Sequence, residues 1–261
     1  MTQPEFRIDS APIASRENQW FRRFKGALES HESEIVLEGP KQVADAIRLG
    51  WDVIAVAEST DRPESSSGFA GRSLRFEPRL MNLIAETRSS QGVLGLFGRP
   101  PSKPEIIFER RQAIVVLDAV QDPGNVGTTI RNAAAFDAAG VVLTEGCADP
   151  FSPKSIRASA GAILALPVWQ TTRAALLEAA ERYGLPLYAA AATSEGSPSE
   201  IPDAALIVFG NEGQGVSAEL LAKSRRVSIP MSRLVESLNV ASASAIVLSQ
   251  IYRRRSHNRE G

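Results

Sequence analysis

The stretch that decides the fold runs from Ala205 to Arg255 and begins with A-L-I-V-F-G-N-E-G-Q-G-V at 205–216. It continues with R-V-S-I-P-M at 226–231 and E-S-L-N-V-A-S-A-S-A-I-V-L-S-Q-I-Y-R-R-R at 236–255. Two short apolar runs, 206–209 and 227–229, have the length and the β-branched content of buried strands. Each run ends at a residue that interrupts regular structure, Gly210 or Pro230.

The last part of the stretch predicts a helix from about Asn239 to about Arg254, because small and β-branched residues recur at helical spacing and a basic turn follows. Three loops are therefore expected to meet at the ends of two adjacent strands and at the start of this helix. In an open α/β sheet, that is where a small molecule binds. The sequence thus predicts a ligand site here.

An earlier segment predicts a parallel sheet. The run that begins at 113–116 is continuously apolar, as in a strand that is covered on both faces. It ends at Asp118, and we expect a loop over 121–127 and a helix over 128–138. Strands and helices alternate onward to residue 191, which predicts an α/β fold with a doubly wound parallel sheet.

The chain divides into four predicted parts. Residues 1–14 are polar and are expected to form a flexible tail. Residues 15–98 alternate strand and helix patterns, which predicts a small α/β domain. The segment R-P-P-S-K-P at 99–104 has the composition of a stiff linker. Residues 105–261 form the larger domain.

Composition indicates an ordinary globular protein, with 43% apolar and 23% charged residues. A single cysteine, Cys147, excludes an internal disulfide and a cysteine-based metal site. Without an apolar run of membrane length or a signal peptide, we expect a cytoplasmic protein with no membrane contact and no metal.

The formal net charge is −1, so any contact with nucleic acid must use local basic patches. The candidate patches are these: Arg22, Arg23 and Lys25; Arg110 and Arg111; Arg225 and Arg226; Arg253, Arg254, Arg255 and Arg259.

Several chemistries are disfavoured by the residues present. The two histidines, His31 and His257, lie in polar segments, which argues against a Ser-His-Asp or Cys-His mechanism. The segment 124–127 lacks the Lys-Ser/Thr pair of a phosphate-binding P-loop, and no dinucleotide fingerprint follows the first strand. A catalyst built from amides, one arginine and one carboxylate remains.

Three ordered motifs resemble the SpoU/TrmH family of RNA ribose 2′-O-methyltransferases. They are D-P-G-N-V-G-T-T-I-R-N-A at 122–133, F-G-N-E-G-Q-G-V at 209–216, and I-P-M at 229–231 with S-L-N-V at 237–240. The resemblance covers roughly residues 104–255. It implies S-adenosylmethionine as cofactor, ribosomal RNA before transfer RNA as substrate, a homodimer and a C-terminal trefoil knot. L-E-G at 37–39 and Q-G-V at 91–93 give the N-terminal half a resemblance to the L30e-like RNA-binding module.

The resemblance also implies site residues. The catalytic positions are Asn125, Arg131, Glu212, Ser237 and Asn239, and the cofactor positions are Thr193, Gly210, Ile229 and Leu238. Arg131, one turn into the expected helix, is suited to hold RNA phosphates and to stabilise the developing 2′-oxyanion. Glu212 is expected to fix Arg131 or a loop amide, and Ser237 to cap the last helix or to touch substrate. Asn211 receives no role.

Other readings stay open from the sequence. The chain can be a non-catalytic RNA-binding or ribosome-assembly factor on the same fold, or a nucleotide-dependent oxidoreductase, which requires NAD binding. The N-terminal half can be a dimerisation or scaffold domain without RNA contact. Small and apolar residues of the last helix predict a subunit contact, namely Ala241, Ala243, Ala245, Ile246, Val247 and Ile251.

Overall fold

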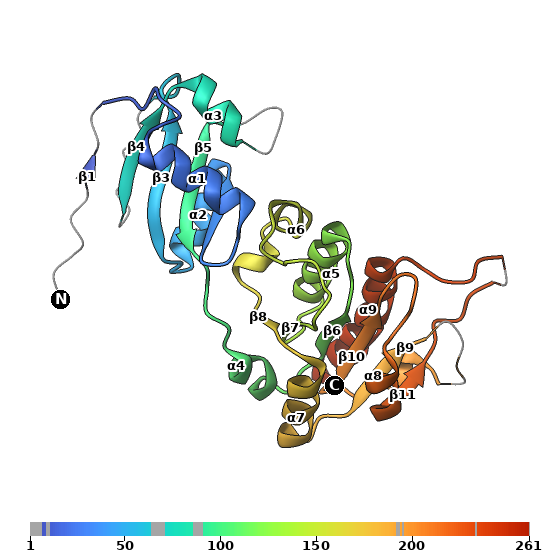
Figure 1. The fold of residues 1–261 in the computed structure, drawn as a ribbon. Coiled ribbons are helices and arrows are strands. Elements are labelled where there is room, and N and C mark those ends of the chain that lie inside the picture. The colour runs from blue at the N-terminus through green and yellow to red at the C-terminus, as the bar shows by residue number, and fades with distance from the viewer. Residues whose placement is uncertain are drawn as a thin grey trace. The chain divides into compact units, whose positions relative to one another are not determined.

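The computed structural model of the chain describes residues 7–8, 11–63, 71–85, 91–191, 194, 196–232 and 234–260. The chain forms two compact units, which are coloured from blue to red along the sequence in Figure 1. One unit comprises Met1–Pro101 with Phe151–Pro153, and the other comprises Ser102–Pro150 with Lys154–Gly261. Within the described residues, no helix has both the length and the apolar character that a bilayer span requires.

The first unit is a five-stranded mixed sheet in the order β1-β4-β3-β5-β2, with three helices. Its strands are β1 (Arg7–Ile8), β2 (Glu34–Glu38), β3 (Val53–Ser59), β4 (Arg72–Phe76) and β5 (Val93–Gly98). Its helices are α1 (Gln19–Glu29), α2 (Pro40–Arg48) and α3 (Pro78–Ile84). The rings of Phe24 on α1 and Phe76 on β4 meet edge to face, 5.8 Å apart, in the core of this unit.

The N-terminal segment is not wholly the flexible tail that its polar composition predicted. Arg7 and Ile8 pair with β4 in parallel, and the N–H of Ile13 donates to the carbonyl of Arg75 over 2.7 Å. Ile13 is buried among the core residues of the unit. Backbone pairing and the burial of Ile13 thus attach part of the segment to the sheet edge.

The second unit confirms the predicted parallel α/β sheet, with six strands in the order β11-β9-β10-β6-β7-β8. All five strand pairs are parallel. The strands are β6 (Ile114–Asp118), β7 (Gly140–Leu143), β8 (Val168–Gln170), β9 (Leu187–Ala190), β10 (Leu206–Gly210) and β11 (Ser224–Val227). The α-helices are α4 (Pro104–Glu109), α5 (Pro123–Ala135), α6 (Pro153–Ala158), α7 (Arg173–Tyr183), α8 (Ala218–Lys223) and α9 (Val240–Glu260), and two 3₁₀ turns are η1 (Ala162–Leu164) and η2 (Pro198–Glu200).

Helices cover this sheet on both faces. Phe108 of α4, Leu176 of α7 and Leu220 of α8 pack in one core with alternate residues of the strands. The intervening strand residues are equally buried and point to the opposite face, because successive side chains of a strand alternate. There α5 contacts β7, α9 contacts β10, and the two helices pack against each other. Burial on both faces explains why the central strands are continuously apolar.

Helix α5 begins at Pro123 rather than at residue 128, so the loop expected over 121–127 is mostly its first turns. The side chain of Asp122 caps it by accepting from the N–H of Gly124 over 2.9 Å, and proline at the first helical position suits the cap. The Lys154 ammonium and the Gly124 N–H hold the pKa of this carboxyl below its usual value. Arg131 consequently lies about two turns into the helix, not one.

Strand β11 also departs from the expectation. It spans Ser224–Val227 instead of 227–229, and β9 separates it from β10, so the two predicted strands are not adjacent. Only Val227 of this edge strand is buried, whereas Arg225 and Arg226 are exposed. Charged residues are common on edge strands, and a search for an apolar run cannot find such a strand.

Two arginines from the predicted basic patch at 253–259 anchor α9 inside the unit. Arg254 donates to the carboxylate of Asp203 and to the carbonyl of Ser199, both over 2.8 Å. Arg255 pairs with Asp137, which also accepts from Arg110 over 3.2 Å. These side chains therefore serve packing, which leaves only part of the patch for contact with nucleic acid.

We expect Asp137→Asn to lower the free energy of unfolding by about 1–2 kcal/mol, because the Arg255 side chain, 9% exposed, loses its anionic partner. The expected loss of stability is kept this small because the side chain of Asp137 is 42% exposed, and water weakens its interaction with Arg255. Asn tolerates the backbone φ of 51° at this position.

Urea unfolding measures the change. Asp203→Asn, which breaks the more exposed pair with Arg254, is the matched control and should cost less. Equal stability of Asp137→Asn and the wild type would contradict the prediction.

Candidate active site

A cavity of about 670 Å³ opens where β9 and β10 end. The carboxyl ends of parallel strands are the usual ligand site of such sheets. Three of the segments that line it were predicted from the sequence: the loop after β10, the residues after β11 and the start of α9. The end of β9, at Ala190 and Ala191, and Pro198 also line it. Its larger apolar side chains include Phe209, Val227, Ile229, Met231, Leu238 and Val247, and the glycine-rich loop 210–215 adds backbone polar groups.

The glycine-rich loop closes on itself above the end of β10. Asn211 and Gly215 exchange two backbone hydrogen bonds, of 3.0 and 2.9 Å. A Cβ on Gly210 would lie 2.1 Å from the carbonyl carbon of Gly215, so a side chain at 210 has no room. Gly210 lines the cavity as predicted, but the loop's own backbone, and not only a close approach by cofactor, requires glycine there.

Three predicted site residues, one from each motif, are joined by side-chain hydrogen bonds. Nδ2 of Asn239 donates to Oδ1 of Asn125 over 2.9 Å, and Nδ2 of Asn125 donates to Oε1 of Glu212 over 2.7 Å. Oδ1 of Asn239 accepts from the backbone N–H of Ala241 and of Ser242. Because those amides can only donate, the orientation of Asn239 and then of Asn125 is fixed along the whole chain of bonds.

This chain of bonds settles two alternatives left by the sequence. Asn239, not Ser237, supplies the side chain that caps α9. Glu212 engages the side chain of Asn125, and Arg131 forms no hydrogen bond or ion pair with any described residue. The expected bond between Glu212 and Arg131 is therefore absent from the described part of a single chain.

The predicted site residues do not all line one space. Glu212, Ser237, Leu238, Ile229 and Asn239 line the cavity. Asn125 lines a neighbouring hollow of about 470 Å³ between the starts of α5 and α9, which Asn239 also borders. Arg131 is exposed on α5 and is among the lining residues of neither space. Thr193 lies outside the described residues.

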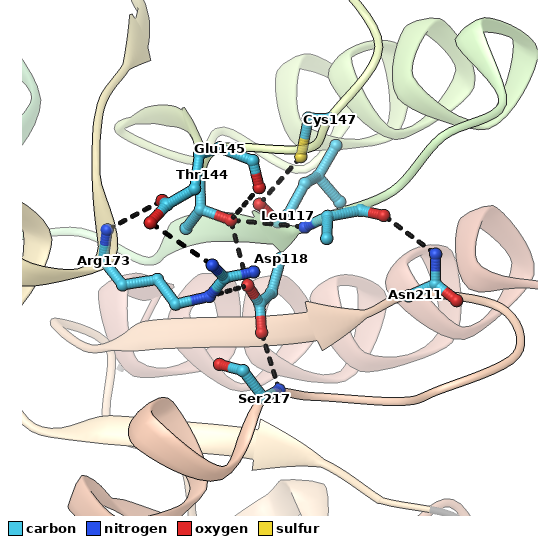
Figure 2. A network of polar contacts seen from close by, with 9 residues as sticks. Leu117, Asp118, Thr144, Glu145, Cys147, Arg173, Asn211 and Ser217 are labelled. Carbon is cyan, nitrogen blue, oxygen red and sulfur yellow. Dashed lines mark hydrogen bonds and ion pairs between the residues drawn. The ribbon is translucent and has the colours of Figure 1, made fainter.

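Beneath the glycine-rich loop, a buried carboxylate organises the ends of the neighbouring strands (Figure 2). Asp118, at the end of β6, is 1% exposed. Its Oδ1 accepts from Nε of Arg173 over 2.7 Å and from the hydroxyl of Thr144 over 2.9 Å, and its Oδ2 accepts from the N–H of Ser217 over 2.7 Å. Glu145 pairs with the same arginine over 3.3 Å.

Sequence reasoning gave neither Asp118 nor Asn211 a function, yet both hold the loop. Asn211 donates from Nδ2 to the carbonyl of Ala119 over 2.9 Å. One feature of the sequence could have pointed to Asp118: it is a charged residue at the end of a fully apolar strand. A charge buried there needs partners, so such a residue is expected to bind neighbouring segments. No comparable signal marked Asn211, since asparagine is common in exposed turns.

Cys147 lies in the same region but is not set up as a nucleophile. Its Sγ donates to the carbonyl of Leu117 over 3.2 Å, and burial raises the pKa of the thiol to about 11. The thiolate is the nucleophilic form, and it is scarce at neutral pH when the pKa is so high. The site therefore offers amides and carboxylates rather than a reactive sulfur.

Comparison with known proteins relates this geometry to a family. The model of the SpoU rRNA Methylase family matches residues 112–249, more than half of the chain. The 23S rRNA (guanosine(2553)-2′-O)-methyltransferase RlmP of Bacillus subtilis is 36% identical over 168 residues, which are 63% of this chain and 66% of that protein. The 23S rRNA (uridine(2479)-2′-O)-methyltransferase of Streptomyces viridochromogenes is 27% identical over 265 residues, 93% of this chain and 92% of that protein.

The chain spans between about half and two thirds of the length of the first curated relatives that it matches. Among solved structures, the AdoMet-bound rRNA methyltransferase of Sinorhizobium meliloti superposes with a TM-score of 0.82 at 25% identity, over 95% of this chain and 98% of that one. The family match contains all three motifs and ends within the first half of α9. The chain belongs to the SpoU rRNA methylase family.

Proposed function

We propose that the protein transfers a methyl group from S-adenosylmethionine to the 2′-hydroxyl of a ribose in RNA, with ribosomal RNA as the substrate class. One observation carries the proposal: Asn239, Asn125 and Glu212, one from each of three separated motifs, are hydrogen-bonded to one another, and Glu212 and Asn239 line the cavity. The named relatives that act on the 2′-oxygen of 23S rRNA support it.

The cavity fits the cofactor in size and character. Its volume is within the range of small-molecule sites, and Ile229 and Leu238 offer apolar surface to an adenine ring. Among the described lining residues, Glu212 and Glu236 are acidic and none is Lys or Arg, which favours a cationic ligand. When bound, the cofactor supplies a methyl group that its positive sulfur already activates.

Arg131 is the residue proposed to hold the RNA and to stabilise the developing 2′-oxyanion. It is exposed and outside the cavity of its own chain. We therefore propose that a homodimer brings Arg131 of one subunit to the cofactor loops of the other. Glu212 and Asn239 then fix Asn125 at the edge of the same site.

Only half of the residues expected at the subunit contact are available for it. Ala241, Val247 and Ile251 are buried within their own unit and cannot supply a contact, whereas Ala243, Ala245 and Ile246 are partly exposed. Tyr252 of α9 is 39% exposed, and its ring lies 6.2 Å from that of Phe136, next to the end of α5. The paired α5 and α9 helices are the proposed dimer face.

RNA contact is proposed to use Arg131, Arg226 and Arg253, which are exposed and form no ion pair with the described residues. The L30e-like character and RNA-binding role of the first unit, the trefoil knot and a cytoplasmic location remain proposals. Transfer RNA is the alternative substrate. A non-catalytic assembly factor would bind RNA without turnover, and an oxidoreductase would bind NAD.

We expect the purified protein to bind S-adenosylmethionine in calorimetry and to methylate ribosomal RNA from cells that lack its gene. Arg131→Ala should lower turnover by about 10²–10³-fold, because one preorganised donor to the transition state is lost. Its affinity for the cofactor should change little, since Arg131 does not line the cavity.

Mapping of 2′-O-methylation in ribosomal and transfer RNA identifies the substrate class. Arg182→Ala, at an exposed position of α7 that is not proposed to contact RNA, is the control for a general loss of positive charge. Cofactor binding without methylation of either RNA would support the assembly factor instead, and NAD binding would support the oxidoreductase.

A mixing experiment tests the shared site. Ile229→Lys places a cation in the cofactor cavity and should abolish cofactor binding, while Arg131→Ala keeps it. If each site combines two subunits, mixed dimers contain one intact site, and an equal mixture regains about a quarter of wild-type activity. Co-purification of differently tagged subunits shows that mixed dimers have formed, and no recovery of activity in them would contradict a shared site. A mass of 28.1 kDa in light scattering, that of a monomer, would contradict the dimer.

A further inference from the structure

Asn211 makes three side-chain hydrogen bonds that together fix its orientation. Oδ1 accepts from the N–H of Gly213 over 2.8 Å and from the N–H of Gln214 over 3.0 Å. Because both amides are donors, Nδ2 must face the other way, where it donates to the carbonyl of Ala119 over 2.9 Å. The oxygen therefore shapes the loop, and the nitrogen attaches the loop to another part of the sheet.

The acceptor of this bond is an unusual piece of backbone. Ala119 has a φ of 56°, in the left-handed region that alanine rarely adopts. It directly follows Asp118, whose carboxylate accepts from the N–H of Ser217. Both ends of the glycine-rich loop are thus attached to two consecutive residues at the end of β6, as Figure 2 shows.

The same two residues begin the connection that leads to α5. Asn125 lies in the first turn of that helix, six positions after Ala119, and Glu212 is the neighbour of Asn211. The bond between Asn125 and Glu212 therefore joins two segments that leave from one anchoring point. Loss of the bond from Asn211 to Ala119 would remove one of the two attachments of the loop, the one nearer to Glu212, and would leave the helix turn that carries Asn125 unchanged.

We propose that Asn211 is a positioning residue: its side-chain nitrogen docks the glycine-rich loop on Ala119 so that Glu212 reaches Asn125. The inference rests on the proposed function for its effect on turnover, but not for its structural content. Asn211 acts through Glu212 and does not itself contact the transferred group.

The substitution Asn211→Asp distinguishes the role of the side-chain nitrogen from that of the side-chain oxygen. A carboxylate keeps an acceptor for Gly213 and Gln214 but offers no donor to Ala119. The first measurement is the NMR signal of the Asn125 side-chain amide, identified by its loss in Asn125→Asp. It should shift in Asn211→Asp in the direction seen in Glu212→Ala, whereas Asn82→Asp, the same change at an exposed position of α3, should leave it unmoved.

Turnover on ribosomal RNA provides the second measurement. Asn211→Asp should lower kcat by about 10–100-fold, as expected when a site group is misplaced, with the cofactor Kd changed less than kcat. In a Glu212→Ala background the further loss should largely disappear, because no side chain at 212 then accepts from Asn125 and the two residues act in series. If Asn211→Asp does not fold by circular dichroism, Asn211→Ser retains an oxygen acceptor without the charge and serves in its place.

An unmoved Asn125 signal in the folded variant, beside a clear shift in Glu212→Ala, would overturn the proposal. Full additivity of the two substitutions in kcat would do the same. Failure of the proposed function is distinguishable, because the wild type would then methylate no RNA while the NMR comparison still reports on the loop.

Discussion

The arrangement of the second unit depends on one buried negative charge. Asp118 ends the central strand β6 with its carboxylate almost completely removed from water. An ionised group in such a place is tolerated only when it is paired and hydrogen-bonded. Arg173, Thr144 and the N–H of Ser217 meet this need, and each comes from a different segment. The carboxylate of Asp118 thus joins the loop after β7, the start of α7 and the start of α8.

The loops that line the cavity are attached, directly or through one another, to the end of β6. The glycine-rich loop is closed by its own backbone and fixed at both ends to the end of β6. Its Glu212 is then joined through Asn125 to Asn239, whose oxygen caps α9. At the other end of that helix, Arg254 and Arg255 bind Asp203 and Asp137. The start and the end of α9 are therefore both held by polar contacts, and its middle packs in the core.

Polar contacts of this kind also engage arginines of the predicted basic patches. Arginines at 110 and 253–255 looked like a surface for nucleic acid, yet Arg110, Arg254 and Arg255 bond to carboxylates of their own unit. A sequence records the charge of a side chain but not its distance to a partner of opposite sign. Local pattern failed in a different way at α5, where Asp122 and Pro123 marked the helix start and the glycines that follow concealed it. Gly127 lies within the helix where the backbone of Ser155 packs closely against it. A Cβ at 127 would lie 2.2 Å from the carbonyl oxygen of Ser155, so no side chain fits there.

The sequence by itself determined the parallel sheet, the family and the three segments that form the cavity, because buried strands and glycine-rich loops leave local patterns of composition and spacing. It also specified Asn125, Glu212 and Asn239 as site residues through the motifs, and these three proved to be bonded to one another. Only the tertiary structure decided that β9 lies between β10 and β11, that Asn211 docks on Ala119, and that Arg131 stands apart from the cavity of its own chain. Each of these depends on contacts between residues far apart in the chain. The periodicity of a single segment predicts its own secondary structure but not which other segment packs against it.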